Sequence, residues 1–133
     1  MGWEIYPEGL RQILEWIRGR DGDMPLYITE NGAAFADTAP GPDGLVEDAP
    51  RVEYFREHLR AARAAMANGV DVRGYFAWSL LDDFEWQHGY SKRFGLYHVD
   101  FKTQRRTAKR SALFYRDVIR SRGRAAFEPF ATA

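Results

Sequence analysis

Residues 26–32 have the sequence Leu-Tyr-Ile-Thr-Glu-Asn-Gly, and this run constrains the architecture of the chain more than any other. A short apolar stretch follows Pro25 and stops at a carboxylate, Glu30, and a tight Asn-Gly turn. The stretch is short and is bounded by turn residues, so it predicts a buried β-strand that ends at Glu30. A second strand is predicted at residues 72–79, which are rich in aromatic and small side chains.

Two predicted helices alternate with these strands. The first begins near Pro7 and ends by Gly22, and the second covers residues 51–68 and stops at an Asn-Gly pair. The order helix, strand, helix, strand predicts parallel βα units and therefore an α/β fold. Apolar residues recur at helical spacing in both segments, namely Leu10, Ile13, Leu14 and Ile17 in the first, and Val52, Phe55, Leu59, Ala62 and Met66 in the second.

The remaining segments interrupt this alternation. Residues 33–50 are rich in Ala, Asp, Pro and Gly and are predicted to form a long loop, a feature that is usually functional inside a compact domain. Residues 80–90 hold three carboxylates and three aromatic rings without any regular period, and are predicted to form a loop beyond a strand end. A short hairpin strand is predicted at residues 96–101, and a last helix from Thr107, as N-cap, to Gly123.

Composition is typical of a single globular domain. The chain has 133 residues, 19 basic and 19 acidic side chains, no cysteine and 45% apolar residues. No apolar run approaches the roughly 18 residues of a membrane span, and the first residues lack the pattern of a signal peptide. We therefore expect no membrane association and a cytoplasmic location.

The basic end of the chain raises the question of a nucleic-acid partner. A cluster of cations can form a nucleic-acid-binding face. The predicted last helix nevertheless keeps an apolar stripe, and no nucleic-acid-reading motif accompanies the charges, so we expect a solvated or partner-facing helix and no nucleic-acid partner. The cations that would form a positive face are Lys102, Arg105, Arg106, Lys109, Arg110, Arg116, Arg120, Arg122 and Arg124.

Four side chains occupy positions that suit a polyhydroxylated ligand. Glu30 and Trp78 stand at the ends of the two predicted strands, where α/β sheets and barrels bind ligands, and Glu85 and Trp86 repeat the same pair of residue types nearby. A carboxylate can serve chemistry or bind hydroxyls, and an indole ring can cover the apolar face of a sugar. A strand-end Glu is also a common turn residue or ion-pair partner, and both Trp residues suit core or loop anchors, so position alone leaves both interpretations open.

Neither a metal nor another cofactor is expected. His88 has no second His or Cys at metal-ligand spacing, and neither a glycine-rich phosphate loop nor a serine nucleophile elbow occurs. Asp82 and Asp83 fit N-cap or turn positions.

Longer motifs resemble one family, glycoside hydrolase family 1, the β-glucosidases and related β-glycosidases. Residues 27–35 (YITENGAAF) resemble its nucleophile motif, residues 74–86 (GYFAWSLLDDFEW) its sugar-binding signature, and residues 89–96 (GYSKRFGL) the usual continuation. Residues 1–10 and 106–112 are similar to the approach to the nucleophile strand and to the last helix. The resemblance covers nearly the whole chain, with several motifs in the family's order.

The resemblance implies a role for each candidate residue. Glu30 matches the nucleophile, which attacks the anomeric carbon so that two inversions give net retention. Trp78 matches a tryptophan of the subsite for the terminal sugar, and Glu85 the carboxylate that accepts hydrogen bonds from the hydroxyls of that sugar farthest from the cleaved bond. Trp86 matches a neighbour that donates an indole N–H, and Phe94 an aromatic that closes the pocket. At Asp83 the family usually has Asn, so the chain departs from the pattern there.

The resemblance also implies that a part of the enzyme is missing. Retaining hydrolysis needs a second carboxylate that serves as acid and base, which the family carries in an Asn-Glu-Pro motif on an earlier strand, and no Asn-Glu-Pro occurs in this sequence. A (β/α)8 TIM barrel takes about 250 residues or more. We therefore expect residues 1–133 to be the C-terminal portion of an incomplete barrel, the last two βα units plus the preceding helix, with no separate second domain.

The expected activity follows from this assignment. The complete enzyme would hydrolyse terminal β-D-glycosidic bonds of small β-glycosides or oligosaccharides, whereas the isolated chain would be inactive. Its open strand edges predict either association with the missing N-terminal barrel portion or self-association. Two other classes stay open: a non-catalytic sugar-binding or interaction module that has lost chemistry, and a scaffold or nucleic-acid-binding piece that uses the basic end.

Overall fold

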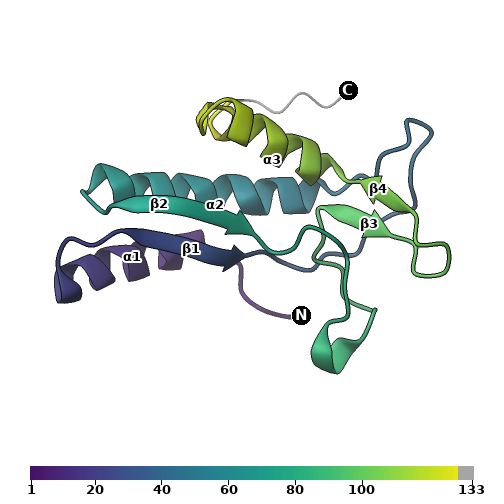
Figure 1. Cartoon of the computed structure of the whole chain (residues 1–133), viewed down its shortest axis with the longest axis horizontal. Helices are drawn as coiled ribbons and strands as arrows, with labels where there is room; N and C mark the ends of the chain where they lie inside the picture. The colour runs from purple at the N-terminus through teal and green to yellow at the C-terminus, as the bar shows by residue number, and fades with distance from the viewer. Residues whose placement is uncertain (129–133) are drawn as a thin grey trace.

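A computed structural model describes residues 1–128, and helices and strands alternate along most of this length (Figure 1). β1 and β2 pair in parallel, which confirms the predicted βα order, and β3 and β4 form a separate antiparallel hairpin. The elements are α1 (Pro7–Asp21), β1 (Leu26–Asn31), α2 (Ala49–Ala67), β2 (Val72–Ala77), η1 (Trp86–His88), β3 (Tyr97–Val99), β4 (Arg106–Ala108), α3 (Arg110–Arg120) and η2 (Arg124–Ala126), where η1 and η2 are single 3₁₀ turns.

The first two helices begin where the sequence predicts, within a few residues. Pro7 and Pro50 lie in the first turns of α1 and α2, where a helix has no use for the N–H that proline lacks. α2 ends at Asn68, whose N–H donates to the carbonyl of Ala64. The helix therefore stops at the predicted Asn-Gly pair.

The prediction for the last helix is wrong at its start. Thr107 lies buried in β4, opposite His98 of β3, and α3 begins only at Arg110. Val46, from the long loop after β1, explains the difference because it donates to the Ala108 carbonyl and accepts from the Arg110 N–H. These bonds hold the chain extended up to Lys109, so the helix starts two residues later than the expected N-cap implies.

The predicted positive face is also smaller than expected. Lys109 is 0% exposed and lies inside the protein, where its ammonium group contacts two buried carboxylates. The guanidinium of Arg110 is paired with Asp43 and Glu47. The apolar stripe of the predicted helix is confirmed by α3, which buries Ala112, Phe114 and Val118.

One side of the β1–β2 sheet is covered by helices. Ile28 of β1 packs with Leu14 of α1 and with the small residues Ala62 and Ala65 of α2. A second cluster joins α2 to α3, with Phe55 and Phe114 fully buried. Burial of apolar side chains between these layers contributes roughly 1.5–3 kcal/mol for each large residue.

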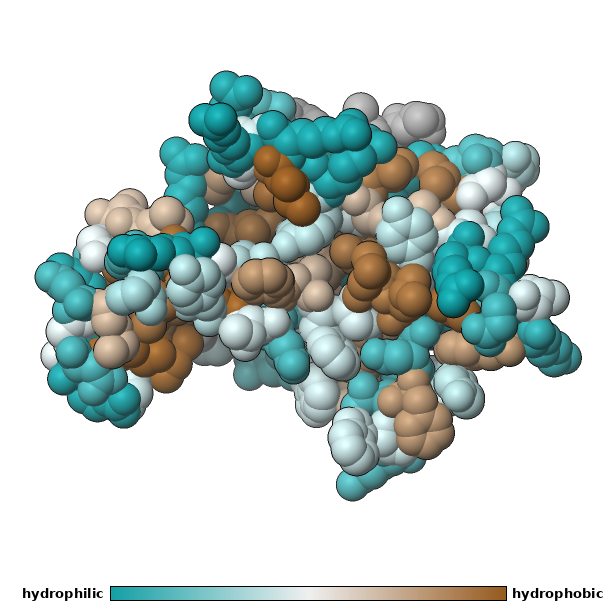
Figure 2. Space-filling model, viewed as in Figure 1, coloured by the Kyte–Doolittle hydropathy of each residue, from teal (hydrophilic) through white to brown (hydrophobic). Residues whose placement is uncertain are grey.

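The other side of the same sheet has no cover within residues 1–128. Tyr27 and Phe76 point away from the helices, and the side chain of Phe76 is 55% exposed. Figure 2 shows hydrophobic side chains at the surface near the middle of the molecule. Large exposed apolar surfaces mark interaction sites in soluble proteins. Among the described residues no helix combines the length and the apolarity that crossing a membrane requires.

Candidate active site

The end of β1 carries Glu30 onto the open side of the sheet. The parallel register between β1 and β2 shifts between Ile28 and Asn31, so side chains no longer alternate strictly there. Thr29 and Glu30 are both exposed, whereas Asn31 turns back toward the helices. The irregular register thus leaves the Glu30 carboxylate facing solvent at the carboxyl end of the strand.

Asn31 is held on the helix side by a chain of tyrosines. The Tyr75 hydroxyl donates to Asn31 Oδ1 over 2.5 Å, and the Tyr115 hydroxyl donates to the Tyr75 carbonyl oxygen over 2.7 Å. Burial raises the pKa of the Tyr75 hydroxyl, which therefore stays protonated and available as a donor. These contacts hold the backbone at Asn31, next to Glu30.

Trp78 reaches the same edge from β2. Its backbone N–H donates to the Asn31 carbonyl oxygen over 2.8 Å, which ties the two strand ends together. Gly32 is required at this crossing, because a Cβ there would lie 1.7 Å from the Trp78 carbonyl oxygen. The glycine of the Asn-Gly turn thus allows Glu30 and Trp78 to approach closely.

The loop after β2 supplies the rest of the site. The chain leaves β2 at Ser79 and returns through Leu96, whose N–H donates to the Ser79 carbonyl oxygen over 2.8 Å. Between these points the 3₁₀ turn η1 carries Trp86, whose side chain is 86% exposed, whereas Phe94 is 2% exposed. The loop was predicted without regular structure, and this short turn is its only helical part within the described chain.

These elements line an open pocket of about 300 Å³. All five candidate residues line it, together with Gly32 and Trp3: Glu30, Trp78, Glu85, Trp86 and Phe94. Two carboxylates among four aromatic side chains can bind hydroxyl groups and cover the apolar faces of a sugar ring. The pocket therefore has the chemistry of a carbohydrate site, with Glu30 at a strand end where catalytic groups project.

Sequence reasoning missed Trp3. The residue lies ahead of α1, in a segment without periodicity, and its ring centroid is 6.4 Å from that of Phe94. The only available signal is its place in the family-like segment 1–10, which predicts no role for it.

Asp83 does not line the pocket. Its Oδ1 atom is buried and has no hydrogen-bond partner. Burial, with a smaller contribution from the charge of Asp82, raises the pKa of the Asp83 carboxyl. The departure from the usual Asn therefore falls outside the lining of the pocket.

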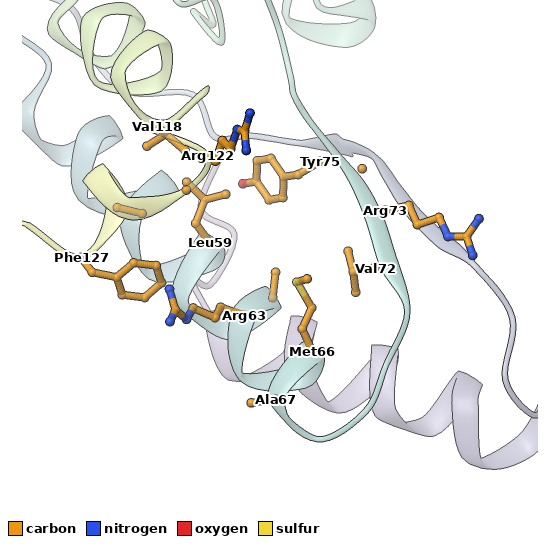
Figure 3. Close-up of a pocket in the computed structure, with 14 residues that line it drawn as sticks. Leu59, Arg63, Met66, Ala67, Val72, Arg73, Tyr75, Val118, Arg122 and Phe127 are labelled. Atoms are coloured by element: carbon orange, nitrogen blue, oxygen red, sulfur yellow. The ribbon is translucent and has the colours of Figure 1, made fainter. Parts of the chain in front are cut away.

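A larger groove lies elsewhere and differs in chemistry. It has a volume of about 590 Å³ and runs between α2, β2 and the end of α3, where Leu59, Val72 and Phe127 contribute apolar surface (Figure 3). Its charged lining residues are all arginines, and no carboxylate faces it. No group of three or more His, Cys, Asp or Glu side chains suited to a metal ion occurs within residues 1–128.

The parallel strands β1 and β2 and the loop that follows them bring carboxylates and indole rings to one pocket, an arrangement that suits carbohydrate binding. The model of one family, "Glycosyl hydrolase family 1", matches residues 1–124, and the chain belongs to this family. The resemblance seen in the motifs is thereby confirmed.

The relatives are β-glycosidases, and the chain matches only a part of each. Beta-glucosidase A of Thermotoga maritima is 48% identical over 123 residues, which are 92% of this chain and 27% of the relative. The bifunctional beta-D-glucosidase/beta-D-fucosidase of Bifidobacterium breve is 49% identical, and the match covers 90% of this chain and 26% of the relative. The chain thus spans about a quarter of the length of the relatives it matches.

Solved structures give the same result. The family 1 β-glucosidase of Thermotoga maritima in complex with isofagomine lactam superposes with a TM-score of 0.89 and is 48% identical, with 92% of this chain and 28% of that chain covered. The same enzyme in complex with cyclophellitol gives the same values. The fold is therefore a partial piece of a TIM barrel.

Proposed function

We propose that this chain supplies the nucleophile side of a retaining β-glycosidase active site. The single observation that carries the proposal is the pocket of about 300 Å³, in which Glu30 and Glu85 stand among Trp3, Trp78, Trp86 and Phe94. Membership of glycosyl hydrolase family 1 supports the same chemistry. The substrates would be small β-glycosides, the class named by the β-glucosidase relatives.

Glu30 would act as the nucleophile in a double displacement. Its carboxylate oxygen attacks the anomeric carbon while a general acid protonates the leaving-group oxygen, the bond to that oxygen breaks, and a covalent glycosyl ester forms with inversion. Water then attacks the same carbon, loses its proton to a general base and releases Glu30 with a second inversion. The exposed carboxylate at the end of β1 is accessible for this attack.

The other pocket residues would hold the terminal sugar. Trp78 presents an aromatic surface to the ring, Phe94 closes the buried end of the pocket, and the Trp86 indole N–H donates to a hydroxyl. Glu85 accepts hydrogen bonds from the hydroxyls farthest from the cleaved bond, those on C4 and C6. Hydrogen bonds to a charged group contribute about 1.5–3 kcal/mol each, so Glu85 would dominate the recognition of these hydroxyls.

The acid and base of the reaction would come from outside this chain. The sequence has no Asn-Glu-Pro motif, and Glu85, the other carboxylate of the pocket, is assigned to hydroxyl binding. We infer that residues 1–133 form the last two βα units of the barrel with the preceding helix, without a second domain. The isolated chain would bind an N-terminal barrel portion, or itself, and would not turn over substrate alone.

The test is reconstitution with a related N-terminal portion. The chain is co-expressed with the part of Thermotoga maritima beta-glucosidase A that precedes the matched region, and hydrolysis of an aryl β-glucoside is measured. We expect turnover from the pair and none from either piece. Glu30→Gln should lower kcat by about 10⁴-fold or more, as removal of other catalytic nucleophiles does.

A matched control separates chemistry from folding. Glu53→Gln changes an exposed carboxylate on α2 that is paired only with Arg56, and should leave the rate unchanged. A reconstituted pair in which Glu30→Gln retains the activity of the parent would overturn the proposal. Sugar binding by the isolated chain, with no turnover after reconstitution, would instead favour the non-catalytic sugar-binding module.

A further inference from the structure

The carboxylate of Asp82 closes the base of the loop that carries Glu85 and Trp86. Asp82 Oδ1 accepts a hydrogen bond from the backbone N–H of Gly95 over 2.9 Å. Asp82 Oδ2 accepts hydrogen bonds from the Arg93 guanidinium over 2.6 Å and from the Val99 N–H over 3.2 Å. Asp82 lies three residues before Glu85, and Gly95 lies directly after Phe94. One buried carboxylate therefore joins the start of this loop to its end, and we call residues 83–94 the pocket loop.

The backbone segments at this junction are tightly packed. A Cβ on Gly95 would lie 2.2 Å from the Asp82 nitrogen, so the two backbone segments are in direct contact. The Asp82 N–H also donates to the Tyr97 carbonyl oxygen over 3.1 Å. The pocket loop thus leaves and re-enters the fold at one tightly packed point.

Lys109 connects this point to the loop that follows Glu30. Its Nζ atom lies 2.8 Å from Asp82 Oδ1 and 2.5 Å from Asp37 Oδ2, and all three side chains are essentially excluded from solvent. Asp37 belongs to the segment between β1 and α2. The ammonium group therefore links the segment after β1 to the base of the pocket loop.

Arg51 of α2 completes the cluster. It contacts Asp37 over 3.1 Å and Asp48 over 2.6 Å, and it donates to the Arg93 carbonyl oxygen over 2.7 Å. Three carboxylates and three cations balance within it. Burial acts to raise the pKa of Asp82, but the hydrogen bonds and charges of Lys109 and Arg93 outweigh it, so the pKa is lowered and the carboxylate stays ionised at neutral pH.

Stability alone does not account for such a cluster. Buried ion pairs repay their desolvation cost only with good geometry, and well-packed apolar side chains often stabilise a fold as well or better. What directed ionic contacts supply is a defined geometry between segments. Here the segments are the pocket loop and the chain that follows the proposed nucleophile.

We infer that Asp82, held by Lys109, is a positioning residue that sets where Glu85 and Trp86 stand relative to Glu30, and thereby the selectivity for the C4 and C6 hydroxyls of the terminal sugar. The inference rests on the proposed function, because it assigns those hydroxyls to Glu85. Asp82 itself does not line the pocket and touches no substrate.

The test is a ratio that does not depend on how much protein folds. The reconstituted pair is assayed on an aryl β-glucoside and on its 4-deoxy and 6-deoxy analogues. The kcat/KM of the glucoside is divided by that of each analogue, and this ratio is compared between variants. A site that hydrogen-bonds a hydroxyl discriminates strongly against an analogue that lacks it. Asp82→Asn should lower the ratio about tenfold, the loss expected when one charged hydrogen bond to the sugar is misplaced.

A double mutant and a matched control sharpen the test. In a Glu85→Gln background, Asp82→Asn should change the ratio no further, because the two residues act through the same contact. Asp48→Asn removes a carboxylate of the same cluster that contacts Arg51 and Ser111 and makes no direct hydrogen bond to the pocket loop. It should lower stability and leave the ratio unchanged. An unchanged ratio in Asp82→Asn, or an equal fall in Asp48→Asn, would overturn the inference.

Two further measurements cover loss of folding and loss of activity. If Asp82→Asn yields no folded protein, Arg93→Gln is assayed instead, which removes one donor to Asp82 together with the hydrogen bond from Arg93 to the Val99 carbonyl oxygen. It should lower the ratio by a smaller factor, and an unchanged ratio would again contradict the inference. If the parent pair hydrolyses none of the three substrates, the proposed function fails. Amide hydrogen exchange on the full chain then tests whether Asp82 positions the pocket loop. Exchange over residues 83–94 should rise at least tenfold in Arg93→Gln and not in Asp48→Asn, and equal protection in both would refute positioning.

Discussion

The two sides of the β1–β2 sheet are built from the same strands but differ in every other respect. On the helix side, Ile28 and Tyr75 pack into apolar clusters with α1, α2 and α3. On the open side, Tyr27, Phe76 and the pocket residues Trp78 and Trp86 face solvent. Within the described residues, helices cover one face of the sheet and leave the other face uncovered. A closed barrel buries that inner face with side chains from its other strands.

The open side also carries the proposed active site. Glu30, Trp78 and the pocket loop all project from that side or from its rim. A surface that is apolar and lacks a partner in the isolated chain becomes, on this account, part of the interior and the active site of the completed enzyme.

The largest contrast is expected between two phenylalanines on opposite sides. Phe55→Ala removes a fully buried ring from the helix side and should lower the free energy of unfolding by about 3–5 kcal/mol. Phe76→Ala removes a ring that is 55% exposed on the open side, and should change it by about 0.5 kcal/mol or less, as exposed substitutions do. Urea unfolding of the dilute chain measures both. Equal losses would show that the open side is covered, for example by a second copy.

The pH dependence of stability should come from the helix side. Burial lowers the pKa of His58, although the hydrogen bond from its ring to the Tyr54 carbonyl oxygen offsets part of the effect. The unfolded chain therefore takes up a proton near pH 6.5 that the folded chain resists. The stability from neutral His58 is complete above about pH 6.5 and falls as the pH drops toward the folded pKa.

The substitution His58→Gln tests the direction of this pH dependence. The variant should show a flatter dependence of the urea midpoint on pH between 7 and 5 than the parent chain. A slope identical to that of the parent would assign the effect to other groups.

The smallest effect is expected at Asp83, in the pocket loop. Burial raises the pKa of this carboxyl, so folding favours its neutral form, and the associated stability is complete below the unfolded pKa near 4 and is lost as the pH rises through the folded value. Asp83→Asn should therefore raise the urea midpoint slightly at pH 7 and leave it unchanged at pH 3. A midpoint that falls at pH 7 would contradict the assignment.

Most of the fold could be predicted from the sequence because the residues that end its helices and strands act locally. Pro25 and the Asn-Gly pair after Glu30 delimit β1, and an equivalent Asn-Gly pair ends α2. The start of α3 was mispredicted because it depends on Val46, more than 60 positions away, whose backbone bonds keep Lys109 extended. Local propensity carries no information about such a bridge.

The candidate site divides in the same way. Glu30, Trp78, Glu85, Trp86 and Phe94 were predicted, and they line one pocket. Asp82 was interpreted as a turn or N-cap residue and Lys109 as a surface charge, yet both lie in the buried cluster. A carboxylate next to a turn and a lysine in a basic segment look ordinary in sequence, and only their meeting across 27 positions reveals the contact.

The most direct test of the central claim, that this chain holds the nucleophile of a site completed by another chain segment, is covalent trapping. The chain is incubated with an activated 2-fluoro-β-glucoside, alone and with the N-terminal portion of the Thermotoga maritima relative, and the labelled residue is located by peptide mass spectrometry. We expect a glycosyl label on Glu30 in the reconstituted pair and no label on the isolated chain. A label on Glu85 or any other residue, or rapid turnover of an aryl β-glucoside by the isolated chain, would contradict the account.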